Sequence, residues 1–139
     1  MRVVVDANVF VSALISPSGT TGELVRKLVE DERTVFLISA VTMDELKRVL
    51  LYPKIQNLRK LSQNEIDCFL SSIEMLAEEM EAAVLASELE CRDSDDIELM
   101  SVATRGRADW LVTGDQDLLI IGAVEGIPIV SPSQLLIKL

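Results

Sequence analysis

The amino-terminal stretch from Arg2 to Phe10 constrains the fold of this chain more than any other segment. Its run of three valines predicts a buried β-strand, and the strand stops at a carboxylate, Asp6, which Asn8 follows two residues later. In a parallel α/β sheet, ligands bind in the crevice outside the carboxyl ends of the strands. Asp6 is therefore expected to lie at the functional edge of the sheet.

Length and composition indicate a single folded unit. We expect the 139 residues to form one domain, residues 1–139, because the chain is too short for two ordinary domains. Hydrophobic residues make up 49% of the chain and charged residues 26%, as in folded globular proteins. Apolar runs stay well short of the ~20 residues that cross a bilayer, so we expect a cytoplasmic protein with no membrane contact.

Residue types that are scarce here exclude several kinds of chemistry. The chain has two cysteines, Cys68 and Cys91, and no histidine, which disfavours a disulfide framework, a zinc site and a serine triad. The net charge of −10 argues against nucleic acid, whose phosphates attract Lys and Arg. Divalent cations can offset acids gathered in one site, however, and local basic patches matter more than the total charge.

Strand and helix patterns alternate along the chain. Strands are predicted at residues 3–5, 34–39, 109–113 and 127–130, while residues 83–86 stay ambiguous between a strand and a helix end. Helices are predicted at residues 9–15, 20–31, 42–51, 62–80 and 96–105, with a last one opening at Ser131-Pro132. Capping-box patterns begin three of them, at Thr20, Thr42 and Ser62. This alternation predicts a three-layer α/β/α sandwich with a central parallel sheet of four to five strands.

Four acidic residues occupy positions that this fold would gather at one edge of the sheet. Asp6 and Asp115 follow strands, Asp96 opens a helix, and Glu45 lies in the first turn of the helix after the second strand. Ordinary explanations exist for three of them. Glu45 fits a capping-box partner, and helix amino termini favour acids such as Asp96 and Asp115 by ~0.3–1 kcal/mol. Asp6 is different, because a strand end offers no helix dipole.

The acids taken together favour a metal site. Carboxylates in one pocket repel one another, and folded proteins tolerate such a cluster mainly when cations occupy it. An oxygen-only ligand set without His or Cys suits Mg²⁺ or Mn²⁺. Two such ions ~3.5–4 Å apart can activate water and stabilise the leaving oxygen of a phosphodiester. The pattern therefore predicts hydrolysis of a polyanionic substrate.

The order and spacing of five segments resemble the PIN-domain family, specifically its small toxins that pair with an antitoxin. These segments are residues 4–10, 44–50, 91–96, 108–119 and 126–132. The resemblance implies a Mg²⁺- or Mn²⁺-dependent endoribonuclease that a cognate antitoxin holds inactive and that often forms dimers. It maps the acidic residues of the family onto Asp6, Glu45, Asp96 and Asp115, and the lining or supporting positions onto Asn8, Thr113 and Asp117.

Two positions depart from the family pattern. Ala7 stands where relatives commonly have a hydroxyl residue, and Ile97 stands where they often have another acid. Asp96 is preferred as the third acid over Asp95 or Asp93, because it lies seven residues before an apolar position on the same helix face. Asp93 and Asp95 are then either supporting groups or solvated loop acids.

The expected reaction is hydrolysis of single-stranded RNA by metal-activated water. Asp6, Asp96 and Asp115 are the expected direct ligands, and Glu45 is either a ligand or the group that orients the attacking water. Two alternatives stay open. An aspartate-nucleophile phosphatase also has an Asp after its first strand, but it normally needs a second acid where this chain has Asn8. A binding module of the same fold, acting through protein contacts alone, is the other alternative.

Further residues are assigned supporting roles. Asn8 is expected to hold Asp6 by a hydrogen bond, and Thr113 to hold a metal-bound water or a phosphate. A homodimer is expected through the apolar faces of the helices at residues 20–31 and 62–80. One basic stretch either guides the RNA backbone or is a solvated helix end and loop; it comprises Lys47, Arg48, Lys54, Arg59 and Lys60.

Overall fold

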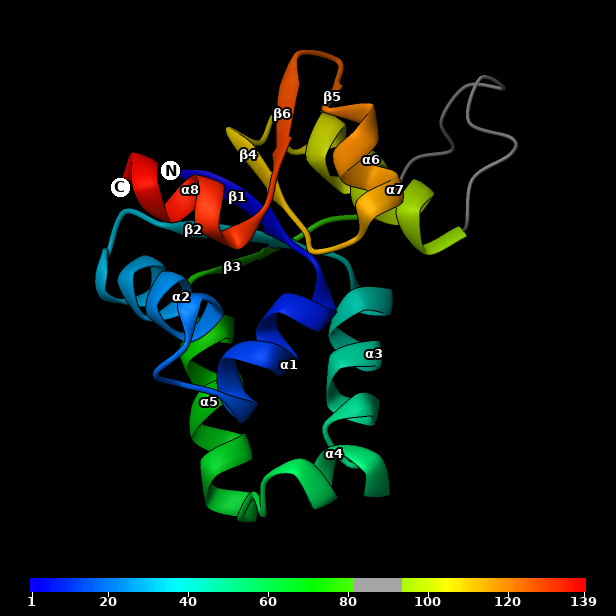
Figure 1. Ribbon diagram of the computed structural model, residues 1–139. Coiled ribbons are helices and arrows are strands. Elements are labelled where there is room, and N and C mark those ends of the chain that lie inside the picture. Colours follow the sequence, from blue (N-terminus) through cyan, green and yellow to red (C-terminus); the bar gives the residue numbers. More distant parts are fainter. Residues whose placement is uncertain (82–93) are drawn as a thin grey trace.

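The computed structural model describes residues 1–81 and 94–139 (Figure 1). Its helices and strands follow the alternation that the sequence predicts. In chain order they are β1 (Arg2–Val5), α1 (Ala7–Ile15), α2 (Thr20–Glu30), β2 (Val35–Ile38), α3 (Ala40–Val49), α4 (Pro53–Leu58), α5 (Gln63–Met75), β3 (Ala77–Glu79), α6 (Ser94–Arg105), β4 (Trp110–Val112), α7 (Gln116–Ile121), β5 (Ala123–Val124), β6 (Ile127–Val130) and α8 (Pro132–Lys138).

The strands of the described residues form a six-stranded sheet in the order β3-β2-β1-β4-β6-β5. Neighbouring strands are parallel, except that the short β5 runs antiparallel to β6. From β1 the chain moves outward to β2 and β3, then returns to β4 on the other side of β1. The strand order therefore reverses between β1 and β4. In open α/β sheets such a reversal leaves a crevice at the carboxyl ends of the two strands.

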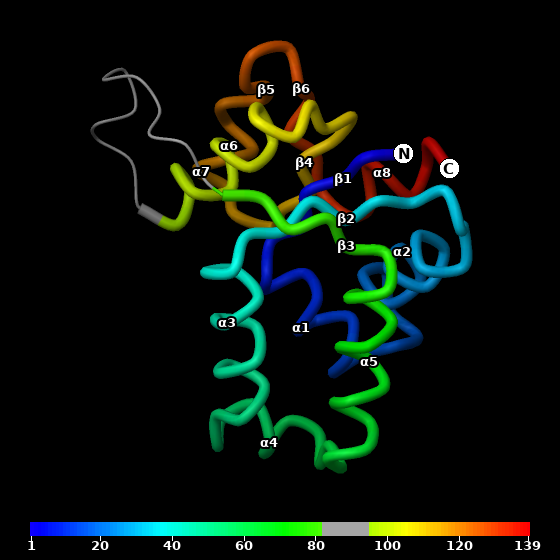
Figure 2. The backbone as a smooth tube through the Cα atoms, turned by 180° about the vertical axis from the view of Figure 1, so that it is seen from behind, coloured from blue at the N-terminus to red at the C-terminus, as the bar shows by residue number. Residues whose placement is uncertain are grey.

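Side chains that alternate along the strands fill one core on each face of the sheet. Val3 and Val5 pack on one face with residues of α1, α2, α5 and α8, including Leu135, which is fully buried. Val4 packs on the other face with residues of α6 and α7, including Met100. Figures 1 and 2 show these two helical layers on either side of the sheet. The predicted three-layer α/β/α architecture is confirmed.

The helix predicted at residues 62–80 is shorter than expected. It ends at Met75, and residues 77–79 form the edge strand β3, parallel to β2. The apolar spacing continues past the helix, but the carbonyl of Leu76 accepts the N–H of Phe36 at 2.8 Å, which starts the pairing with β2. With β3 and the hairpin strand β5, the sheet has six strands within residues 1–81 and 94–139, rather than four to five. Residues 83–86, left ambiguous by the sequence, lie outside the described residues.

Two of the three predicted capping boxes are wrong. Helix α2 is preceded by Gly19, which offers no side-chain cap, and α3 is capped by Ser39, whose hydroxyl accepts the N–H of Thr42 at 3.1 Å. Glu45 therefore lies in the second turn of α3 and is not a capping-box partner. The third box, at Ser62, is confirmed with both of its reciprocal bonds. Within the described residues, no helix is long and apolar enough to span a bilayer.

Candidate active site

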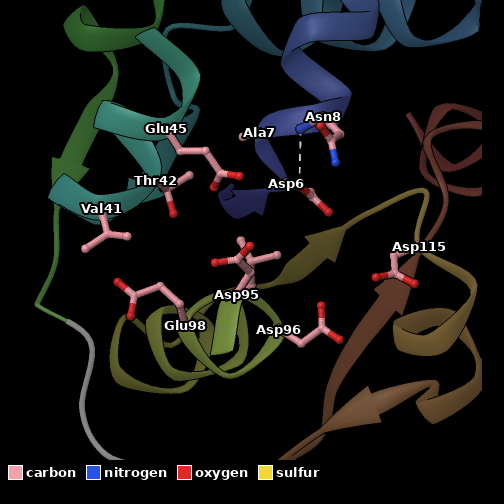
Figure 3. Close-up of a pocket in the computed structure, with 11 residues that line it drawn as sticks. Asp6, Ala7, Asn8, Val41, Thr42, Glu45, Asp95, Asp96, Glu98 and Asp115 are labelled. Carbon is pink, nitrogen blue, oxygen red and sulfur yellow. Dashed lines mark hydrogen bonds between the residues drawn. The ribbon is translucent and has the colours of Figure 1, made fainter. Parts of the chain in front are cut away.

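A cavity of about 210 Å³ opens at the carboxyl ends of β1 and β4, the point where the strand order reverses (Figure 3). Within the described part of the chain, four segments line it, and the structure brings the four acids singled out in the sequence onto its wall. Its carboxylates are Asp6, Glu45, Asp95, Asp96, Glu98 and Asp115. The other lining residues are Ala7, Asn8, Val41, Thr42 and Leu99.

The connections between strands explain why these acids meet. Helices α1, α3 and α7 follow β1, β2 and β4, so each begins at the carboxyl edge of the sheet. Helix α6 precedes β4 and must also begin at that edge before it crosses back. Helix amino termini carry a partial positive charge, which favours nearby carboxylates. The amino termini of α1, α3 and α6 therefore offset part of the repulsion among the acids.

Asp6 is fixed by hydrogen bonds to both of its carboxylate oxygens. Its Oδ1 accepts the backbone N–H of Asn8 at 3.2 Å, and its Oδ2 accepts the hydroxyl of Thr113 at 2.9 Å. The first bond makes Asp6 the N-cap of α1, so Asp6 does lie at a helix amino terminus, contrary to the expectation from the sequence. Figure 3 shows Asp6 between Glu45 on α3 and Asp115, with Asp96 facing it from α6.

Thr113 joins Asp6 to the segment that carries Asp115. The Thr113 side chain is fully buried, and its hydroxyl oxygen accepts the backbone N–H of Asp115 at 3.0 Å. Asp115 in turn caps α7, because its Oδ1 accepts the N–H of Asp117 at 2.9 Å. Asp117 itself is exposed and does not line the cavity. The hydroxyl of Thr113 therefore makes hydrogen bonds to the segments that carry Asp6 and Asp115 and does not face solvent.

The first turns of α6 contribute three carboxylates. Asp96 is 8% exposed, whereas Asp95 is exposed, and both line the cavity. Glu98, which the sequence analysis missed, also lines it. Glu98 follows Asp95 by three residues, which places the two on one helix face. This spacing is the sequence signal that could have identified Glu98 as a cavity residue. Asp93 lies outside the described residues.

The donor set of the cavity fits a hard divalent cation. Among the described residues that line it, all of the charged donors are carboxylate oxygens, the ligands that Mg²⁺ and Mn²⁺ prefer. Across residues 1–81 and 94–139, no three acidic side chains converge closely enough to hold a metal ion in their present positions. The carboxylates thus share a cavity without meeting at a single point.

The predicted basic stretch lies away from the cavity. Helix α3 starts at the cavity and spans ten residues, ~15 Å, so its basic last turn and the following α4 lie at the far end (Figures 1 and 2). Lys47 pairs with Glu74 at 3.5 Å, and Arg59 pairs with Glu65 at 3.7 Å and donates to the carbonyl of Leu14. Arg59 is partly buried, and the exposed members of the stretch are Lys47, Arg48, Lys54 and Lys60.

The fold and the site together define a class: α/β/α proteins with a carboxylate-lined cavity where the strand order of the sheet reverses. The sequence profile of the PIN domain family matches residues 2–117, and the chain therefore belongs to that family. PIN domains are generally nucleases and typically bind divalent metals. The family predicted from the sequence is thus confirmed.

Two similar proteins illustrate the relationship. The chain is 34% identical over 124 residues to the uncharacterized protein MJ1680 of Methanocaldococcus jannaschii, covering 86% of this chain and 74% of the relative. Its structure is similar to one in the crystal structure of VapBC2 from Rickettsia felis bound to a DNA fragment from their promoter. That match has a TM-score of 0.65 and 19% identity, and covers 94% of this chain and 98% of the other. It establishes the likeness of the fold.

Proposed function

We propose that this protein is a Mg²⁺- or Mn²⁺-dependent endoribonuclease that hydrolyses single-stranded RNA. The observation that carries the proposal is that Asp6, Glu45, Asp96 and Asp115 line one cavity where the strand order reverses. An oxygen-only site of this kind suits cations that also bind phosphate. Membership of a family of nucleases supports the same reaction.

The carboxylates take distinct roles in the proposed reaction. Asp6, Asp96 and Asp115 hold the cation, and Glu45 is either a further ligand or the group that orients the attacking water. A divalent ion bound there supplies Lewis acidity toward the phosphodiester and charge that draws the carboxylates together. Asp6 needs little reorganisation, because hydrogen bonds already fix both of its oxygens.

We further propose that the protein is the toxin of a toxin–antitoxin pair. Its structural neighbour belongs to a VapBC2 complex bound to promoter DNA, which supports a DNA-binding antitoxin as the partner here. The exposed basic residues in the last turn of α3 and in the segment after it guide the RNA backbone in this proposal, and Asn8 lines its path into the cavity. The protein acts in the cytoplasm as a homodimer, and sedimentation of the purified chain tests the dimer.

Cleavage assays test the reaction. Labelled single-stranded RNA and a phosphomonoester are each incubated with the protein in Mn²⁺, Mg²⁺ or EDTA. We expect RNA cleavage that needs the metal and disappears in Asp6→Asn. Asp67→Asn is the matched control, because Asp67 is exposed on α5 and outside the cavity. Phosphomonoester release alone would indicate a phosphatase, and a folded protein without either activity would indicate a binding module.

A further inference from the structure

We propose that Tyr52 is a stacking platform for one base of the single-stranded RNA, about three nucleotides away from the carboxylate cavity. The proposal rests on the proposed function in taking RNA as the ligand. Its basis is one exposed aromatic ring among exposed basic side chains, at the far end of the helix that starts at the cavity.

Tyr52 differs in its exposure from the other aromatic residues. The chain has one Tyr, one Trp and three Phe, all within the described residues. Phe10 and Phe36 are buried. Phe69 and Trp110 are partly buried, whereas Tyr52 is 44% exposed. Aromatic side chains bind single-stranded RNA by stacking on its bases. Tyr52 is therefore the aromatic ring most open to such a base.

The position of Tyr52 relates it to the cavity. Glu45 lines the cavity, and Tyr52 follows it by seven residues, which is about two helical turns. The helical winding continues past the end of α3, because the N–H of Leu51 donates to the carbonyl of Arg48 at 3.1 Å and the N–H of Tyr52 to that of Val49 at 3.0 Å. Tyr52 thus lies on the same side of the helix as Glu45, ~10 Å along its axis. At ~3.4 Å per stacked nucleotide, about three nucleotides span this distance.

The charges around Tyr52 suit a polyanion. Arg48 and Lys54 are exposed, and neither forms an ion pair within the described residues. Lys47, on the opposite side of α3 from Glu45, instead pairs with Glu74 at 3.5 Å. Positive charge that follows the backbone, combined with an aromatic ring that stacks on a base, is the usual arrangement for binding single strands.

Acidic residues disfavour the opposite route out of the cavity. A neighbouring hollow of about 350 Å³ lies toward β3 and shares Val41 and Glu98 with the cavity. Glu79 and Glu81 also line this hollow, and its described lining residues include no Lys or Arg. Phosphates on that side would meet carboxylates, whereas phosphates that follow α3 reach Arg48. The RNA strand is therefore directed along α3 toward Tyr52.

This arrangement predicts a loss of RNA affinity when the ring is removed. Loss of one base–aromatic stack weakens binding by about 5–150-fold, and we expect an effect in this range for Tyr52→Ala. Tyr52→Phe keeps the ring and should bind within about threefold of the unmodified protein. Tyr52→Leu keeps an apolar side chain without the ring and should resemble Tyr52→Ala.

Leu51→Ala is the matched control. Leu51 is 62% exposed and adjacent in sequence, but it lies on the side of the helix opposite Glu45. This variant should bind RNA like the unmodified protein. The control separates stacking on an aromatic ring from general contact with an apolar surface, which a protein partner would also use.

The experiment measures binding of a fluorescein-labelled 12-nucleotide RNA without secondary structure, by anisotropy in Mn²⁺. Every variant is made in full-length Asp6→Asn, so that the RNA stays intact, and circular dichroism checks its folding. The measurement is repeated over a range of salt concentrations. Tyr52→Ala should leave the slope of log Kd against log salt unchanged, because it removes no charge. Arg48→Ala should reduce that slope by about 0.7, because it removes one phosphate contact.

The outcomes separate this inference from the proposed function. RNA affinity that is unchanged in folded Tyr52→Ala and Tyr52→Leu overturns the stacking role, and so does an equal loss in Leu51→Ala. RNA binding that depends on the ring, without RNA cleavage by the unmodified protein in Mn²⁺ or Mg²⁺, overturns the nuclease and leaves the stacking role standing. Absence of RNA binding by both Asp6→Asn and the unmodified protein overturns both.

Discussion

The contact between Gly22 and the turn after α1 makes a sharp stability prediction. A Cβ atom added to Gly22 would lie 2.2 Å from the carbonyl oxygen of Pro17 and 2.5 Å from its carbonyl carbon. The first distance is about 1 Å shorter than an ordinary C···O contact. These are backbone atoms, so a rotamer change cannot relieve the overlap. In Gly22→Ala, either α2 or the turn must move.

The expected loss follows from two opposing effects. Overpacking of a well-packed region costs about 1–3 kcal/mol, whereas alanine stabilises a helix by up to about 1 kcal/mol relative to glycine. We therefore expect the free energy of unfolding to fall by about 1–2 kcal/mol. The unfolding entropy of a chain of this length is about 0.3 kcal/mol per kelvin, so Tm should fall by about 3–7 °C.

Thermal unfolding followed by circular dichroism measures the effect. Gly114→Ala is the control, because a Cβ there meets nothing within 4 Å and the residue lacks a positive φ. Its Tm should stay close to that of the unmodified protein. A Gly22→Ala variant as stable as the unmodified protein would refute the reasoning, since it would mean that the turn yields at no cost.

Three further predictions concern the cavity, the basic stretch and acid stability. Mn²⁺ at about 100 times its dissociation constant should raise Tm by about 9 °C, and a similar rise in Asp6→Asn would place the ion elsewhere. Arg59→Ala should lower Tm, because it removes a hydrogen bond to the carbonyl of Leu14 in α1, whereas Lys54→Ala should weaken RNA binding and leave Tm unchanged. A loss of stability in Lys54→Ala and a loss of RNA binding in Arg59→Ala would contradict these roles. The backbone N–H and guanidinium of Arg33 hold the pKa of the Asp31 carboxyl below its ordinary value, so the stabilisation is present above that value and is lost on acidification. The Tm difference between the unmodified protein and Asp31→Asn should therefore shrink below about pH 4, and a difference independent of pH contradicts this.

Local signals in the sequence were sufficient for much of the architecture. The valine run of β1, the cap at Ser62 and the Ser131-Pro132 start of α8 depend on residues next to one another in the chain, and the structure has all three. The placement of acids after strands also follows from local patterns together with a general property of parallel sheets. The sequence therefore determined the fold class and the edge of the sheet at which to seek the site.

Tertiary structure decided the features that depend on distant segments. Residues 77–79 keep a helical apolar pattern, yet they form β3 because β2 offers them backbone partners. Ser39 caps α3 in place of Thr42, and Glu98 joins the cavity only because α6 crosses back beside β1. The bridge from Thr113 to Asp6 spans 107 residues of sequence, and it forms because β1 and β4 are neighbours where the strand order reverses. Strand order is a property of the whole packed sheet, and no local pattern encodes it.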